Sequence, residues 1–185
     1  MPLLETRASA SAQGYGLFGA TSTSNFFLIQ QLTPSAVSTI TFNSIPSTYK
    51  SLQVRFNLIP TNSTNWEMQF NGDSSTANYA MHWLYGTGSA VVAGGLASGT
   101  IGYIQMAHAG QVLTYPSVGM IDIIDYANAS KNKTVKVLTG GNNNTATGQI
   151  DIDSGLWLST SAITSLAFFV GAGTFTGTIS LYGVS

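Results

Sequence analysis

The stretch KSLQVRFNLI (50–59) decides the fold class of this chain. Its apolar and polar residues occupy alternate positions: Leu52, Val54, Phe56 and Leu58 against Gln53, Arg55 and Asn57. Successive side chains of a β-strand point to opposite faces of the sheet, so this alternation predicts a strand with one buried and one exposed face.

Similar segments recur along the rest of the chain, separated by Gly, Asn or Ser-Thr clusters. They are NFFLIQQL (25–32), VSTITFNSI (37–45), WEMQFNGDSS (66–75), ANYAMHWLYG (77–86), GTIGYIQMA (99–107), SVGMIDIIDYA (117–127), KTVKVLTG (133–140), GQIDIDSGLWL (148–158), ITSLAFFVG (163–171) and FTGTISLYGV (175–184). No amphipathic helix of useful length interrupts them. The pattern predicts an all-β fold: an antiparallel two-sheet sandwich, jelly-roll-like, with about ten strands.

The composition points to a neutral surface covered by other subunits. Charged residues make up 7% of the 185 residues, where globular chains carry roughly a quarter, while the apolar fraction of 44% is ordinary. Disorder requires few apolar residues and high charge, so it does not fit. A net charge of −1 argues against nucleic acid as a partner. The basic segment KNKTVK (131–136) is interpreted as a solvated edge strand.

The sequence also argues against a membrane span, disulfides and a signal peptide. The longest uncharged apolar run, AVVAGGLA (90–97), is too short to span a bilayer, so no membrane insertion is expected. The chain has no Cys, which excludes disulfides. The start of the chain lacks the apolar core of a signal peptide.

Catalytic residues are not apparent in the sequence. His82 and His108 lie in contexts that suggest no general base, there is no GxSxG motif, and each is interpreted as a turn or interface residue. A glycosidase requires two carboxyl groups across a cleft, and no such pair can be located. We therefore expect a protein that is not an enzyme and carries no cofactor.

One acidic pair is a candidate metal site. Asp151 and Asp153 share one face of a predicted strand, with Ile150 and Ile152 on the other face. The simpler interpretation is an outward polar face, and the alternative is a calcium site completed by a third oxygen ligand.

Aromatic residues leave a sugar site open. Trp66, Trp83 and Trp157 are in phase with apolar neighbours and predict core packing. Four tyrosines are less constrained by the pattern and could stack on a sugar ring: Tyr79, Tyr85, Tyr103 and Tyr115. The residues that would contact a glycan stay unknown.

The first residues, MPLLETRASASAQGYGLFG, fit neither a helix stripe nor a strand alternation. Residues 1–24 are therefore predicted to form an extended N-terminal arm attached to a β-sandwich domain at 25–185. The arm carries large apolar side chains that can occupy pockets on a partner: Leu3, Leu4, Tyr15, Leu17 and Phe18. The alternative is a disordered tail, which would gain nothing from those side chains.

Six stretches, taken in order, carry a resemblance to a known family and together cover about three quarters of the chain. They are ITFNSIPSTYKSLQVRF (40–56), MQFNGDSSTANY (68–79), LYGTGS (84–89), IDIIDYANASKNKTVKVL (121–138), SGLWLSTSAITSLAFF (154–169) and TISLYGV (178–184). These stretches resemble small β-sandwich modules from virion proteins of tailed bacteriophages. The arm, with its Gly14-Tyr15-Gly16 step, resembles the short attachment peptides of phage fibre-type proteins.

The resemblance implies a virion location and a structural function. The expected protein is a short fibre or similar surface appendage on the tail or baseplate, anchored by its arm and in reach of a host-surface glycan. The resemblance also implies a homotrimer that contacts other virion proteins of the tail, baseplate or capsid. Two alternatives stay open: a capsid decoration (cement) protein on the head shell, and a carbohydrate-binding or glycan-cleaving module.

Overall fold

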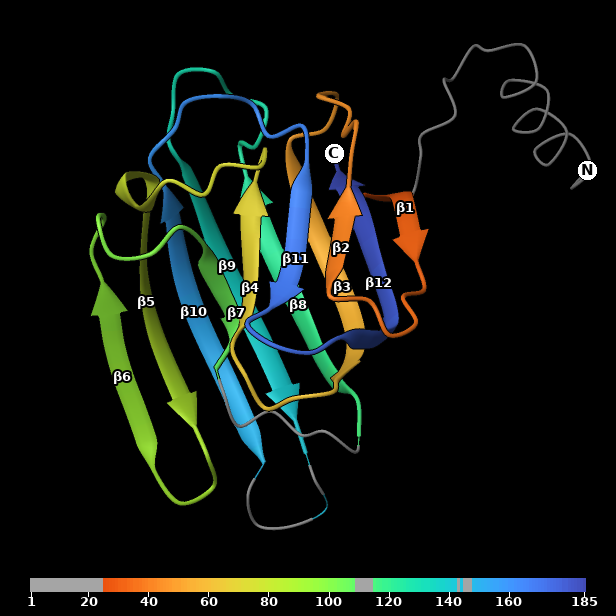
Figure 1. The fold of residues 1–185 in the computed structure, drawn as a ribbon. Coiled ribbons are helices and arrows are strands. Elements are labelled where there is room, and N and C mark those ends of the chain that lie inside the picture. Colours follow the sequence, from red (N-terminus) through yellow and green to blue (C-terminus); the bar gives the residue numbers. More distant parts are fainter. Residues whose placement is uncertain (1–24, 109–114, 143, 145–147) are drawn as a thin grey trace, which may run out of the picture.

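The computed structural model describes residues 25–108, 115–142, 144 and 148–185. Within them, twelve strands form two antiparallel sheets (Figure 1). The strands are β1 (Phe26–Leu32), β2 (Thr39–Phe42), β3 (Ser51–Pro60), β4 (Trp66–Phe70), β5 (Tyr79–Gly86), β6 (Val91–Leu96), β7 (Ile104–Ala107), β8 (Ser117–Ile124), β9 (Lys133–Gly141), β10 (Gln149–Trp157), β11 (Leu166–Val170) and β12 (Phe175–Val184). A 3₁₀ turn, η1 (Thr76–Asn78), precedes β5. The predicted all-β two-sheet sandwich is confirmed, and the predicted arm lies outside the described residues.

The chain passes repeatedly between the two sheets. The larger sheet has the order β1-β12-β3-β8-β9-β10-β5-β6, and the smaller has the order β2-β11-β4-β7. Figure 1 shows the smaller sheet packed over one face of the larger, which leaves the other face of the larger sheet uncovered by any strand. No helix in the described part of the chain is long and apolar enough to cross a membrane.

The core lies between the sheets and contains the side chains that alternation predicted. The apolar residues of β3 are buried, and the ring of Phe56 lies 5.8 Å from that of Trp66. Trp66 in turn packs edge-on against Phe175 at 5.2 Å. Trp157 is buried as predicted, whereas Trp83 is only half-buried against the core. Tyr79, expected to be less constrained, is fully buried, and its hydroxyl donates to the backbone carbonyl of Asp73 at 2.8 Å.

The strand β6 was not predicted. It comes from AVVAGGLA (90–97), a run without period-2 alternation, and it pairs only with β5 at the edge of the larger sheet. An edge strand that is largely exposed on both faces has no reason to alternate, so periodicity cannot reveal it.

The edge-strand interpretation of KNKTVK was wrong. The strand β9 lies inside the larger sheet and pairs with both β8 and β10. Lys133 is fully buried, and its ammonium donates to the backbone carbonyls of Asn128 and Lys131, each at 2.6 Å. Those carbonyls replace the water molecules that normally solvate a lysine ammonium. The sequence therefore looks like a solvent-exposed charged segment, although the side chain of Lys133 is buried.

Candidate functional site

The strand β10 has its polarity reversed. Asp151 and Asp153 are 0% and 1% exposed between the sheets, while Ile150 and Ile152 are 62% and 49% exposed on the outer face. The expectation that the aspartates form an outward polar face was therefore wrong. Alternation predicted correctly which residues share a face, but the faces are exchanged. This reversal is unfavourable twice, because it buries carboxylates and exposes isoleucines. Such departures from the usual burial pattern concentrate at functional sites.

The outer isoleucines belong to a larger apolar surface on the uncovered face of the eight-stranded sheet. Two parallel rows of residues cross the five strands β8, β9, β10, β5 and β6. In the first row the direct pairing partners are, in order, Val118, Gly140, Ile150, Gly86 and Val91. In the second row they are Met120, Leu138, Ile152, Leu84 and Ala93. We call these two rows the apolar face.

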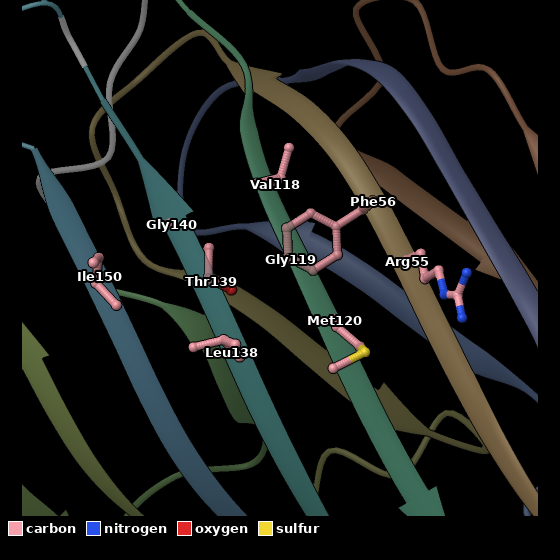
Figure 2. Close-up of a pocket in the computed structure, with 9 residues that line it drawn as sticks. All are labelled: Arg55, Phe56, Val118, Gly119, Met120, Leu138, Thr139, Gly140 and Ile150. Atoms are coloured by element: carbon pink, nitrogen blue, oxygen red, sulfur yellow. The ribbon is translucent and has the colours of Figure 1, made fainter.

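The two rows differ in relief. In the first row large side chains alternate with glycines, and a Cβ at Gly140 or Gly86 would meet no other atom closer than 4.0 Å. The glycines therefore leave gaps that open outward. Figure 2 shows the part of the apolar face on β8, β9 and β10, where Val118, Met120, Leu138 and Ile150 line a groove around one of these gaps. The groove is a shallow apolar depression rather than an enclosed pocket.

A third row is polar and borders the apolar face. Its pairing partners are Asp122, Lys136, Ser154 and His82. Lys136 forms an ion pair with Asp122 at 2.9 Å, and Gln53 donates to the same carboxylate at 2.8 Å. Burial raises the pKa of Asp122, but the hydrogen bonds from Gln53 and Lys136 and the nearby cations outweigh it, so the pKa is lowered. Asp122 and Lys136 are thus paired with each other beside the apolar rows, while Arg55, the cross-strand partner of Met120 on β3, places a further charge at the end of the second row.

On the inner face, the aspartates of β10 meet a histidine from the other sheet. His108 directly follows β7 of the smaller sheet, and its Nδ1 lies 3.1 Å from Asp151 and 3.7 Å from Asp153. Asp151 also accepts hydrogen bonds from the Gln149 side chain at 2.8 Å and from the backbone N–H of His108 at 3.2 Å. The three side chains form the His–Asp–Asp cluster, and their potential ligand atoms all lie within 4.8 Å of one another.

The members of the cluster are not equally satisfied. Both carboxylate oxygens of Asp153 and Nε2 of His108 are buried without a hydrogen-bond partner among the described residues. Burial raises the pKa of the Asp153 carboxyl to about 7; the charge on Asp151 adds to the rise and His108 opposes it. The carboxyl group therefore lacks the donors that normally accompany a buried acid.

Neighbouring strands hold the cluster in place. The rings of Tyr85 and Trp83, on β5, lie 4.8 and 5.2 Å from the His108 ring. Gly155 on β10 lets β7 approach, because a Cβ there would lie 2.5 Å from the side chain of Ile104. The imidazole is thus fixed between the two sheets.

Sequence reasoning located part of this arrangement. It paired Asp151 with Asp153 as a candidate metal site, and the structure adds His108, which had been assigned to a turn or interface. The predicted docking residues lie outside the described part of the chain: Leu3, Leu4, Tyr15, Leu17 and Phe18. The apolar face was not predicted. Its only signal was the Ile–Asp alternation of β10, which by itself does not reveal which set of side chains faces outward.

No protein-family model matches the sequence, and a search of curated proteins finds no match. Among solved structures, the chain is similar to Caenorhabditis elegans galectin LEC-6, with 11% identity over 88% of this chain and 99% of that chain and a TM-score of 0.38. It is also similar to CG-16, a homodimeric agglutinin from chicken liver, with 16% identity, 75% and 99% coverage and a TM-score of 0.27. At these values the comparisons carry no argument about function. The chain is an all-β, two-sheet antiparallel sandwich whose function must be inferred from its own outer and inner faces.

Proposed function

We propose that this chain is a structural subunit of a virion, and that copies of it associate through the apolar face. The main observation in support of this association is the pair of apolar rows that crosses five adjacent strands on the uncovered side of the larger sheet. The virion setting rests on the resemblance of six stretches to phage β-sandwich modules. The subunit acts by occupying a place in the particle, with the arm at 1–24 as its anchor.

The extent of the apolar face supports an interface. Five strands about 4.8 Å apart make the rows about 19 Å long, and the two rows are separated by about 7 Å along the strands. Single exposed apolar residues are common on monomers, but contiguous apolar patches of several hundred Å² mark binding surfaces. The polar row beside the patch is the kind of boundary that interfaces have at their rim.

A second copy of the same chain suits this surface. The outward gaps at Gly86 and Gly140 can receive branched side chains, and the same face supplies them at Val118 and Ile150. The charged residue at the edge of the groove, Arg55 on β3, is already engaged within the chain: its Nε donates to Gln53 at 2.6 Å and its guanidinium lies over the Phe26 and Tyr182 rings. The family resemblance implies a trimer, in which the three apolar faces turn toward the axis.

Sedimentation of the purified chain tests the assembly. We expect a mass of three times 19.4 kDa, unchanged by added sodium chloride because apolar contacts are not screened by salt. The double variant Leu138→Lys/Ile152→Lys should sediment as a folded monomer. Its control is Ser154→Lys, which adds one lysine at an exposed position of β10 in the polar row and should stay oligomeric; the single variant Ile152→Lys, with the same added charge on the same strand, should weaken the oligomer. A wild-type chain that stays monomeric at tens of micromolar would remove the basis of the proposal.

Imaging of labelled particles tests the setting. A label on the tail or baseplate supports an appendage, and a label over the head shell supports the capsid-decoration alternative. Glycan-array binding by a monomeric chain, without any particle location, would instead favour the carbohydrate-binding alternative and contradict the structural role.

A further inference from the structure

We propose that the His–Asp–Asp cluster binds one divalent transition-metal ion, with zinc as the preferred ion. The ligands are Nδ1 of His108 and one carboxylate oxygen each from Asp151 and Asp153. This inference does not depend on the virion assignment or on the apolar face, since it concerns the opposite side of the same sheet.

The spacing of the three side chains matches a metal site. Zinc binds imidazole nitrogen and carboxylate oxygen at about 2.0–2.2 Å in a tetrahedron, which places neighbouring ligand atoms about 3.3–3.6 Å apart. His108 Nδ1 lies 3.1 Å from Asp151 Oδ1 and 3.7 Å from Asp153 Oδ1, so these separations bracket the required value. Three protein ligands and one water make a complete coordination shell for zinc.

The absence of hydrogen bonds to the described part of the chain is an independent observation that favours Asp153 as a metal ligand. Its carboxylate is 1% exposed, and neither oxygen has a hydrogen-bond partner among the described residues. Leaving a carboxylate buried and unsatisfied costs several kcal/mol, and buried acids are normally paired or coordinate a metal. A cation between Asp153 and His108 would satisfy this side chain without moving any strand.

The surroundings restrict the positions of Asp151 and His108. Gln149 and the backbone N–H of His108 both donate to Oδ1 of Asp151 and hold its carboxylate in place. The rings of Trp83 and Tyr85 restrict rotation of the imidazole. Such outer contacts fix ligand geometry and increase affinity.

The ligand types select the metal. Calcium and magnesium prefer oxygen ligands only, whereas imidazole together with carboxylate suits zinc and its first-row neighbours. The calcium site considered from the sequence assumed a third oxygen ligand, and the structure supplies a nitrogen. A bound ion would tie β10 of the larger sheet to the residue that follows β7 of the smaller one. In a chain without cysteine, this link would take the place of a disulfide as a cross-link between the sheets.

The test uses the full chain, stripped with a chelator and titrated with zinc sulfate by calorimetry and equilibrium dialysis. We expect one zinc per chain and a Tm that rises by about 5–10 °C when free zinc exceeds its Kd about a hundredfold. Cobalt should bind at the same site and show visible absorption bands. Magnesium and calcium at equal concentration should leave the Tm unchanged.

Four variants locate the site. His108→Gln and Asp153→Asn should each weaken zinc binding by about a hundredfold or more. The matched controls are His82→Gln and Asp125→Asn, which alter exposed residues of the same types and should leave the Kd unchanged. Binding that survives in both cluster variants, or that disappears with His82→Gln, would overturn the proposal, as would failure of the wild-type chain to bind zinc.

The thermal stability of the metal-free Asp153→Asn variant distinguishes a ligand role of Asp153 from a purely structural role. Removing an unsatisfied buried charge should raise the Tm of the metal-free protein by about 2–4 °C while zinc no longer stabilises it. A lower Tm than that of the metal-free wild type would show that the carboxylate is a structural acceptor and would contradict a ligand role.

Discussion

Asp73 shows how one side chain joins elements that are distant in sequence. Its Oδ2 accepts from the indole N–H of Trp157 at 2.7 Å and from the Asn78 side chain at 2.8 Å, while its Oδ1 accepts from the backbone N–H of Ser75 at 2.9 Å. The carboxylate therefore ties the loop after β4 to the end of β10. Burial raises the pKa of Asp73, but the three hydrogen bonds outweigh it and hold the pKa below its ordinary value.

This arrangement predicts a pH-dependent effect of Asp73→Asn. A depressed carboxylate pKa stabilises the fold at pH values above the unfolded pKa of about 3.9, and that stabilisation is lost as the pH falls through the lower folded pKa. The amide has only one acceptor oxygen, so its N–H₂ must face at least one of the three donors. We expect a loss of about 1–3 kcal/mol in the free energy of unfolding at pH 7. The difference from wild type should narrow below about pH 4.

Urea unfolding at several pH values measures this effect. Asp125→Asn is the control, because the ion pair of Asp125 with Lys131 joins two solvent-accessible side chains and its loss should change the free energy of unfolding by about 1 kcal/mol or less. An Asp73→Asn penalty that stays constant from pH 7 to pH 3 would show that the charge of the carboxylate is not involved.

At the scale of elements, glycines divide into two kinds according to the face they occupy. A Cβ at Gly155, on the inner face of β10, would lie between 2.5 and 2.8 Å from three side-chain atoms of Ile104. A Cβ at Gly140, on the outer face of β9, would meet only one backbone oxygen, at 4.0 Å. The first glycine allows the two sheets to pack closely, and the second leaves a gap in the apolar face.

The two glycines predict opposite outcomes for the same substitution. Gly155→Ala should lower the free energy of unfolding by about 1–3 kcal/mol, because Ile104 must move within a packed core. Gly140→Ala should leave it unchanged or slightly raised, since alanine costs less conformational entropy in a strand than glycine. Thermal unfolding of both variants in parallel measures the contrast. Equal penalties would mean that the sheets do not pack as described.

The elements also show how far sequence can predict this fold. The sequence predicted eleven of the twelve strands: most from period-2 alternation, which a strand buried on one face must show, and segments such as 25–32 and 163–171 from their β-branched and aromatic content. Asn71 and Gly72 have positive φ, 52° and 69°, a sequence typical of a hairpin turn, but this turn leads from β4 of the smaller sheet into β5 of the larger one. Alternation gives the residues that share a face, whereas pairing across sheets decides which face is inside.

The candidate site also depends on contacts that the sequence does not reveal. The carboxylates of β10 could be paired from their spacing, but their burial depends on His108, which lies more than forty residues earlier in the chain and on the other sheet. The apolar face likewise arises only when five strands align in register. Neither contact has a local signal, so both had to come from the structure.

For the whole molecule, the proposed assembly and the proposed metal site together would account for both the low charge and the reversed strand. A free monomer with 7% charged residues and exposed isoleucines would be poorly protected against self-association. A subunit that is covered on its outer face and cross-linked by a metal between its sheets needs neither surface charge nor disulfides. On this proposal the unusual composition follows from assembly, and the sandwich and the arm have separate roles.

That separation predicts the effect of removing the arm. A chain reduced to residues 25–185 should unfold within about 2 °C of the full chain and sediment with the same number of subunits, because the core and the apolar face lie wholly within the sandwich. The same chain should no longer be incorporated into particles.

Tyr15→Ser/Phe18→Ser should reproduce this loss in the full chain, whereas Ser9→Ala/Ser11→Ala, also within the arm, should be incorporated normally. Quantitative mass spectrometry of purified particles measures incorporation. Normal levels of the Tyr15→Ser/Phe18→Ser variant would refute the docking role of the arm, and a truncated chain that fails to fold would refute the division at residue 24.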